Sequence, residues 1–208
     1  MFQAFKARIK NMDRRLILYP ACYGYVAVSY LTTNHYLFMP AKFLPRTFID
    51  VNTPFLPWTV WIYSSVYFMP LFAAVYVTKK EHYNRIAVSY VLTATICTLF
   101  FLFYPTIYPR PQIGENSITG ILLRILHFID TPANCWPSGH VAYAFLSAFW
   151  VARFRRKEGA WLIFWAFLIA ISTLTTKQHY IWDVLAGYFL ARLSFKLCLP
   201  KDDKVLAG

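Results

Sequence analysis

Asn-Cys-Trp-Pro-Ser-Gly-His, residues 134–140, is the stretch around which the chain is organised. It ends a polar loop and begins an apolar run, so Ser138 is placed to cap a helix whose first backbone N–H groups are free. Such a helix end carries about half a positive charge and favours anions, and His140 adds a titratable proton beside it. Pro-Ser-Gly is also common at the start of a helix that binds nothing, so this stretch alone is compatible with an anion site and with an ordinary helix start.

A second polar stretch, Lys-Gln-His-Tyr-Ile-Trp-Asp at residues 177–183, also stands at the start of an apolar run. His179 and Asp183 are four residues apart and share one face if the segment is helical. A carboxylate beside an imidazole fixes its tautomer and stabilises the imidazolium, as nucleophilic and acid/base histidines require. The alternative is an ion pair at a membrane edge, although charged groups in spans are costly and usually functional.

These two stretches resemble the second and third signatures of the phosphatidic acid phosphatase type 2 superfamily, Pro-Ser-Gly-His and His-x-x-x-Asp. Arg110-Pro111 resembles the end of the first signature, and the resemblance covers residues 54–191. The chain departs from the family pattern at two points. Phe103 stands where the first signature begins with Lys, and Ser172-Thr173 stands where the third has Ser-Arg.

The composition indicates a single integral membrane domain over residues 1–208. The chain is 58% hydrophobic, 20% aromatic and only 14% charged, which is too apolar for a soluble protein of this size. A net charge of +12 could suggest a nucleic-acid partner, but the distribution of the basic residues fits a membrane topology and no nucleic acid is expected. The four cysteines form no Cys-x-x-Cys pair, so no disulfide framework or zinc motif is predicted.

The apolar runs predict an all-α polytopic membrane protein with six transmembrane helices. The predicted spans are Leu16–Leu31, Leu56–Thr78, Ile86–Tyr108, His140–Phe154, Ala160–Thr176 and Ile181–Leu199. Between the third and fourth spans, residues 112–136 carry apolar side chains at helical spacing, which predicts an interfacial helix. The fourth span is shorter than the roughly 20 residues that cross a bilayer, so His140 is expected to lie below the outer surface.

The distribution of basic residues predicts an N-in/C-in orientation. Sixteen of the 21 Lys and Arg residues fall in the N-terminal segment, the stretches Lys79–Arg85 and Arg153–Lys157, and the tail from Arg192. The opposite loops hold five, so the positive-inside rule puts both termini in the cytoplasm. Arg110, His140 and His179 then meet at the outer face. Cys135, which lies outside the apolar runs, is expected to be reachable from that side.

The resemblance implies phosphoryl transfer in which His179 attacks phosphorus to form a phosphohistidine, while Asp183 orients its ring. His140 would protonate the leaving oxygen and then deprotonate the incoming acceptor. The groups expected to bind the phosphate oxygens are Arg110, Ser138 and the Gly139 N–H.

Lys177 is the candidate substitute for the basic residues that the family pattern has and this chain lacks. It stands two positions before His179, so it can reach the same phosphate only if residues 177–179 form a loop. The alternative is a lysine that extends to the lipid headgroups. The chemistry needs no cofactor, and no cluster of Asp, Glu and His residues has metal-ligand spacing, so no metal is predicted.

The predicted function is a lipid phosphatase of the bacterial inner membrane, which hydrolyses a phosphate or diphosphate headgroup at the periplasmic face. Its expected partners are the membrane and a phospholipid or polyprenyl phosphate substrate. The alternative is a phosphotransferase that passes phosphate or a phospho-headgroup to an alcohol, because Thr53–Trp58 and Thr176–Tyr180 resemble the inositol phosphorylceramide synthase branch. A transporter is disfavoured, because the polar residues stand at span ends on one side.

Overall fold

The computed structural model describes residues 15–77, 80–114 and 117–199, and this part of the chain is all-helical, with no strands. The α-helices are α2 (Arg15–His35), α3 (Phe48–Asn52), α4 (Val60–Ser64), α5 (Met69–Tyr76), α6 (Lys80–Phe103), α7 (Ile118–Ile129), α8 (Gly139–Phe154), α9 (Arg156–Thr175) and α10 (Ile181–Cys198). Two 3₁₀ segments, η1 (Pro57–Thr59) and η2 (Ser65–Phe68), flank α4. The predicted all-α class is confirmed.

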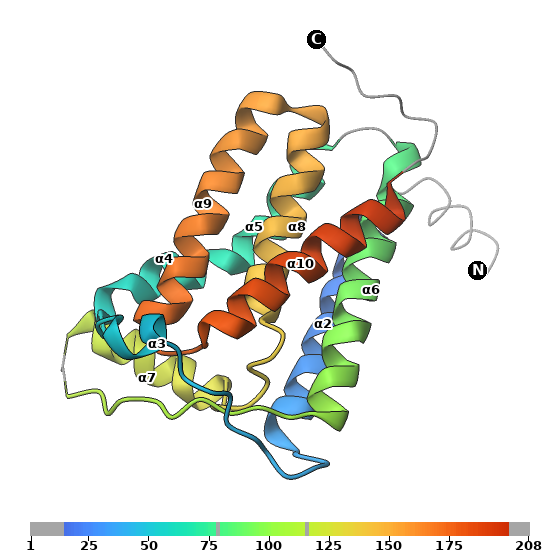
Figure 1. Ribbon diagram of the computed structural model, residues 1–208. Helices are drawn as coiled ribbons and strands as arrows, with labels where there is room; N and C mark the ends of the chain where they lie inside the picture. The colour runs from blue at the N-terminus through green and yellow to red at the C-terminus, as the bar shows by residue number, and fades with distance from the viewer. Residues whose placement is uncertain (1–14, 78–79, 115–116, 200–208) are drawn as a thin grey trace, which may run out of the picture.

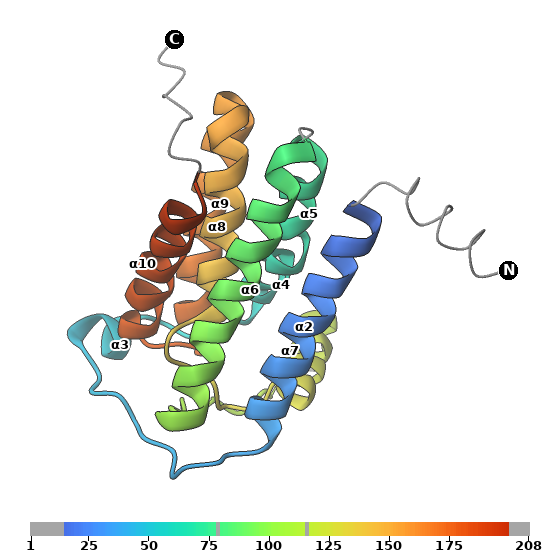
Figure 2. The same cartoon turned by 90° about the vertical axis from the view of Figure 1, so that its right-hand side faces the viewer.

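Helix α8 is the centre of the bundle, and α5, α6, α9 and α10 pack around it (Figure 1). Its buried residues are spread around the whole helix and include Phe145 and Trp150. A helix that is apolar on all faces is stable only when other helices cover it. On the outside of the bundle, α2 packs along α6 (Figure 2).

The two ends of the bundle differ in what they carry. The α8–α9 turn, the C-terminal end of α10 and the start of α2 lie at one end (Figures 1 and 2). That end exposes Arg155, Arg156 and Lys157. Helices α3 and α7 and the N-terminal ends of α8 and α10 lie at the other end. The stretches at residues 134–140 and 177–183 are therefore brought to one end of the molecule, away from the basic α8–α9 turn.

Three helical stretches in the described residues are long and apolar enough to cross a bilayer, namely Pro57–Tyr76, His82–Phe103 and Arg156–Thr175. They mark the chain as a membrane protein. Helix α8 has only 16 residues, close to the short fourth span that the sequence predicts. The count of six spans, their orientation and the interfacial position of α7 stay predictions.

The stretch Pro57–Tyr76 is a broken helix. Helix α4 gives way to the 3₁₀ turn η2 after Ser64, and α-helical geometry resumes at Met69. Pro70 explains the break, because proline has no N–H to donate and its ring clashes with the carbonyl four residues earlier, at Val66. The break begins at Ser65, so Tyr63 lies in the last turn of α4, just before it.

A glycine sets the distance between α10 and the start of α8. A Cβ atom at Gly187 would lie 2.5 Å from the Ser138 carbonyl oxygen and 3.2 Å from the Val141 side chain. Real Cβ atoms do not approach backbone so closely, so any larger residue forces the two helices apart. The close packing brings residues 179–183 against residues 138–140.

Gly187→Ala should therefore destabilise the protein by about 1–3 kcal/mol, the usual cost of overpacking a well-filled interior. Thermal unfolding in detergent measures this. Gly24→Ala is the matched control, because a Cβ at Gly24 meets no atom within 4 Å. That change should be neutral or slightly stabilising, since alanine is the better helix former. Equal unfolding midpoints for the two variants would contradict the close approach.

Candidate active site

His179 and Asp183 meet through the N-terminal cap of α10. The helix begins at Ile181, so His179 lies just before it, and the two residues do not share a helix face as the spacing had suggested. Instead Asp183 turns back, and its Oδ2 lies 2.7 Å from the Tyr180 backbone nitrogen and 3.3 Å from His179 Nδ1. The carboxylate therefore caps the helix and orients the imidazole with the same oxygen.

The second histidine of the site, His140, lies against the first. His140 Nδ1 is 3.5 Å from His179 Nε2, and the ring centroids are 5.7 Å apart. Both histidines are buried. His140 stands in the first turn of α8, whose predicted cap is confirmed because Ser138 Oγ accepts from the Val141 N–H. The site thus combines two imidazoles with a helix N-terminus.

The expected phosphate ligands are held in different ways. Ser138 Oγ is used in the cap, and the Ser138 N–H donates to the Asp183 carbonyl oxygen at 3.1 Å. The Arg110 guanidinium donates to the carbonyl oxygens of Asp130 and Thr131 and lies 3.5 Å from Asp130 Oδ2. Its Nε is buried and has no hydrogen-bond partner among the described residues. Gly139 is the first residue of α8 and precedes His140, so its N–H is the first backbone donor of the helix.

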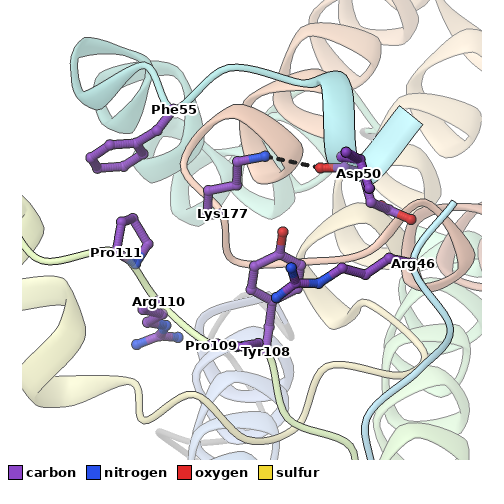
Figure 3. A pocket seen from close by; sticks show the side chains of 9 residues that line it. Arg46, Asp50, Phe55, Tyr108, Pro109, Arg110, Pro111 and Lys177 are labelled. Atoms are coloured by element: carbon purple, nitrogen blue, oxygen red, sulfur yellow. Dashed lines mark hydrogen bonds between the residues drawn. The ribbon is translucent and has the colours of Figure 1, made fainter. Parts of the chain in front are cut away.

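A pocket of about 320 Å³ lies next to these groups (Figure 3). Its cationic lining residues are Arg46, Arg110 and Lys177, and its one acidic lining residue is Asp50. Both carboxylate oxygens of Asp50 accept backbone N–H groups, from Thr47 and Ile181. Because the acidic charge is already hydrogen-bonded, the pocket offers an excess of positive charge to an anionic group.

The chain matches the family model described as the PAP2 superfamily over residues 31–197. It belongs to the PAP2 superfamily. The chain is also 30% identical over 131 residues to the bacitracin transport permease protein BcrC of Bacillus licheniformis, an alignment that covers 62% of each protein. The match therefore spans less than two thirds of that relative. No solved structure shows significant similarity to the chain.

In this PAP2 protein, two polar residues that the sequence analysis did not single out contact the predicted site. Tyr63 OH lies 2.9 Å from His140 Nε2, and Asp130 Oδ2 lies 3.5 Å from the same hydroxyl. Asp130 is the C-cap residue of α7 and Tyr63 lies in α4. Neither belongs to a recognisable motif, and both are brought to His140 by packing between α4 and α7.

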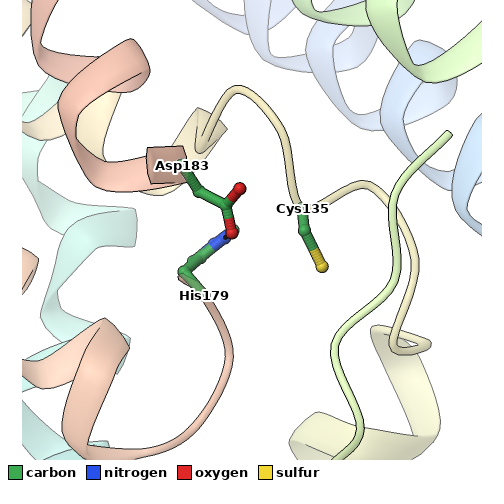
Figure 4. Close-up of side chains that lie close together, drawn as sticks. All are labelled: Cys135, His179 and Asp183. Carbon is green, nitrogen blue, oxygen red and sulfur yellow. Dashed lines mark hydrogen bonds and ion pairs between the residues drawn. The ribbon is translucent and has the colours of Figure 1, made fainter. Parts of the chain in front are cut away.

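Cys135 corrects one expectation. It is buried, so it is not a reachable thiol, and burial raises its pKa well above the usual value. The Cys135 thiol reaches towards the carbonyl oxygens of Pro132 and Gln178. Its sulfur and one ligand atom each of His179 and Asp183 lie within 4.8 Å of one another (Figure 4). This is the one group of three metal-ligating side chains found among the described residues, and the sequence spacing gave no sign of it.

Lys177 lies in the loop between α9 and α10, which is the condition for it to reach the same phosphate as His179. It directly follows the C-cap of α9 and has an unusual backbone conformation. The Lys177 N–H donates to the Leu174 carbonyl oxygen and the Gln178 N–H donates to that of Thr173, which is the Schellman pattern. Lys177 has φ 56°, a left-handed conformation that normally selects glycine. Its Nζ donates to the carbonyl oxygens of Asp50 and Thr53 at the pocket, and burial lowers its pKa.

Lys177→Gly should be more stable than Lys177→Ala by about 1 kcal/mol, because only the alanine keeps a Cβ in the left-handed region. Both variants lose the ammonium group, so the comparison isolates the backbone. If the ammonium also binds phosphate, both should lose turnover by on the order of a hundredfold. Chemical unfolding and phosphate release measure the two effects. Equal stability of the variants would contradict the strained loop, and turnover within a few-fold of wild type would leave Lys177 a purely structural role.

Proposed function

We propose that this protein is a membrane lipid phosphatase that hydrolyses a phosphate or diphosphate headgroup through a phosphohistidine on His179. The observation that carries the proposal is the pairing of the two histidines. His179 is oriented by Asp183 at Nδ1, and its Nε2 faces His140 Nδ1 across 3.5 Å. One nitrogen is thus prepared as a nucleophile, and a proton carrier stands beside it.

The reaction proceeds in two displacements at phosphorus. In the first, the lone pair of His179 Nε2 forms the N–P bond. The P–O bond to the lipid breaks, and the leaving oxygen takes a proton from His140. In the second, His140 takes a proton from water, the water oxygen bonds to phosphorus, and the N–P electron pair returns to His179. Asp183 stabilises the imidazolium character that His179 gains while phosphorylated.

Charge stabilisation comes from groups that are fixed before the substrate binds. The α8 N-terminus presents the Gly139 N–H towards the site, and the unpartnered Arg110 Nε is a further donor for an equatorial oxygen. The other guanidinium nitrogens of Arg110 are held by Asp130 and Thr131, which keeps its orientation fixed. The cationic pocket suits the remainder of an anionic headgroup. No metal takes part in this scheme.

A phosphotransferase is the alternative, in which an alcohol replaces water in the second displacement. The residues of the site serve both acceptors equally. The relative from Bacillus licheniformis is named as a transport permease. For this chain, the contacts that join His140, His179, Asp183 and Asp130 near the N-terminal ends of α8 and α10 favour chemistry at a membrane surface over a transport path.

His179→Ala should abolish phosphoenzyme formation with every substrate, because the nucleophile is gone. His140→Ala should lose activity on lipid phosphates by at least about a hundredfold. It should still form phosphoenzyme from p-nitrophenyl phosphate, whose leaving group needs no proton, and then break it down slowly. Rapid-quench trapping of acid-labile, base-stable label measures both steps.

His35→Gln is the matched control, because His35 lies at the same end of the bundle and bonds to the Ile129 carbonyl oxygen outside the site. Its burst should equal that of wild type. Label on His140, or an undiminished burst from His179→Ala, would reverse the two assignments. Release of phosphate in water, as against a labelled ester formed only with added alcohol, separates the phosphatase from the phosphotransferase.

Cysteine labelling tests the proposal that the site lies at the periplasmic face of the membrane. The four cysteines are all buried, so wild-type protein gives a low background with thiol reagents. Gln112→Cys places an exposed thiol next to Pro111 of the pocket, and Lys157→Cys places one in the first turn of α9, at the other end of the bundle. A membrane-impermeant maleimide should label the first in intact spheroplasts and the second only after the membrane is opened. The reverse pattern would invert the orientation.

A further inference from the structure

The buried Tyr63 hydroxyl contacts His140, and the buried Asp130 carboxylate contacts that hydroxyl. Neither group has a role in the two displacements at phosphorus. Tyr63 OH lies 2.9 Å from His140 Nε2 and 3.3 Å from Nδ1, and the tilted rings are 4.8 Å apart. The same hydroxyl donates to Asp130 Oδ2 at 3.5 Å. Tyr63 has no solvent exposure and Asp130 is 4% exposed. Buried polar groups are normally hydrogen-bonded, and these contacts supply the partners of the Tyr63 hydroxyl.

We propose that Tyr63 and Asp130 are positioning residues that fix which nitrogen of His140 carries the transferred proton. The hydrogen bonds run from the His140 Nε2–H to the Tyr63 oxygen, and from the Tyr63 O–H to Asp130. His140 Nδ1 is then left as the nitrogen that faces His179 Nε2. The inference rests on the proposed function, because it assigns His140 the role of acid and then base.

The direction of these hydrogen bonds follows from the partners of Asp130. It is held by further donors, from Tyr30 OH at 2.6 Å and Asn34 Nδ2 at 3.0 Å, and it lies 3.5 Å from Arg110. A carboxylate only accepts hydrogen bonds, so Tyr63 must donate to it. The Tyr63 oxygen is then the acceptor for His140 Nε2–H. No proton leaves Tyr63 or Asp130 during the reaction.

The two histidines are thus supported by different means. Asp183 contacts His179 directly, at 3.3 Å, which gives the nucleophile full carboxylate support while it is phosphorylated. Asp130 reaches His140 only through a neutral hydroxyl. This weaker support suits a residue that must give its proton to the leaving oxygen and take one back from water, because a directly bonded carboxylate would hold the cation.

The helices explain why Tyr63 is fixed. A buried cluster between α4 and α7 consists of Val60, Tyr63, Leu123 and Leu126, and Asp130 is the C-cap of α7. Tyr67 also lies against His140, with the rings edge-on and their centroids 6.1 Å apart, and no hydrogen bond joins its hydroxyl to the imidazole among the described residues. Tyr67 is therefore a natural control for the loss of a hydroxyl beside the same imidazole.

Tyr63→Phe should impair proton transfer and leave the nucleophile intact. With an alkyl phosphate, whose leaving group needs a proton, phosphoenzyme formation should slow by on the order of tenfold to a hundredfold. With p-nitrophenyl phosphate it should stay within about threefold of wild type, as expected where no acid is required. Asp130→Asn should give the same leaving-group dependence in weaker form. Tyr67→Phe should show none. Rapid quench under single-turnover conditions measures each rate constant.

The outcomes separate this inference from the proposed function. Equal losses with both substrates, or no loss with either, would overturn the positioning role of Tyr63 while wild-type protein still forms phosphohistidine. Absence of phosphohistidine in wild-type protein would overturn the proposed function and this inference with it. Should Tyr63→Phe fail to fold, Asp130→Asn gives the same test, because its leaving-group dependence is predicted independently.

Discussion

The site depends on the contact between the start of α10 and the start of α8. The Ser138 N–H donates to the Asp183 carbonyl oxygen, so the two polar stretches of the sequence are joined backbone to backbone. Gly187, one turn further along α10, has no side chain to keep the helices apart. Asp183 then uses one carboxylate oxygen to hold its own helix end and the imidazole of His179. A shift of either helix would move His179, the proposed nucleophile, relative to His140, the proposed acid, and such displacements are costly in catalysis.

Much of the fold was predictable because apolar runs and caps are local signals. The predicted interfacial stretch contains α7, and the short apolar run from His140 to Phe154 matches α8 to within one residue. The pairing of His140 with His179 followed from motif and topology together. The break after Ser64 was not predicted, although Pro70 was a visible signal for it.

The partners of His140 could not be predicted from the sequence. Tyr63 and Asp130 are 67 residues apart and reach each other only after α4 packs on α7. The burial of Cys135 was missed for the same reason, since a polar loop was expected to be exposed and here lies under the loop of residues 177–180. The expectation for Lys177 rested on its charge, whereas the structure shows that its backbone conformation is the unusual feature. A left-handed lysine at a position suited to glycine carries backbone strain, which its side-chain hydrogen bonds to the carbonyl oxygens of Asp50 and Thr53 help to offset.

The connection of residues 47–56, which contains α3, links these observations, because it contacts both ends of the segment that carries His179. Asp50 accepts from the Ile181 N–H at the first turn of α10, and the Leu56 N–H donates to the Thr175 carbonyl oxygen. Lys177 donates to two carbonyl oxygens of the same connection. Asp50 and Lys177 therefore line the pocket and also hold the segment that carries His179. If the proposed headgroup binds in the pocket and draws Lys177 away from those carbonyl oxygens, it also acts on the segment that carries His179. The proposed function therefore couples headgroup binding to the alignment of the proposed nucleophile through a single side chain.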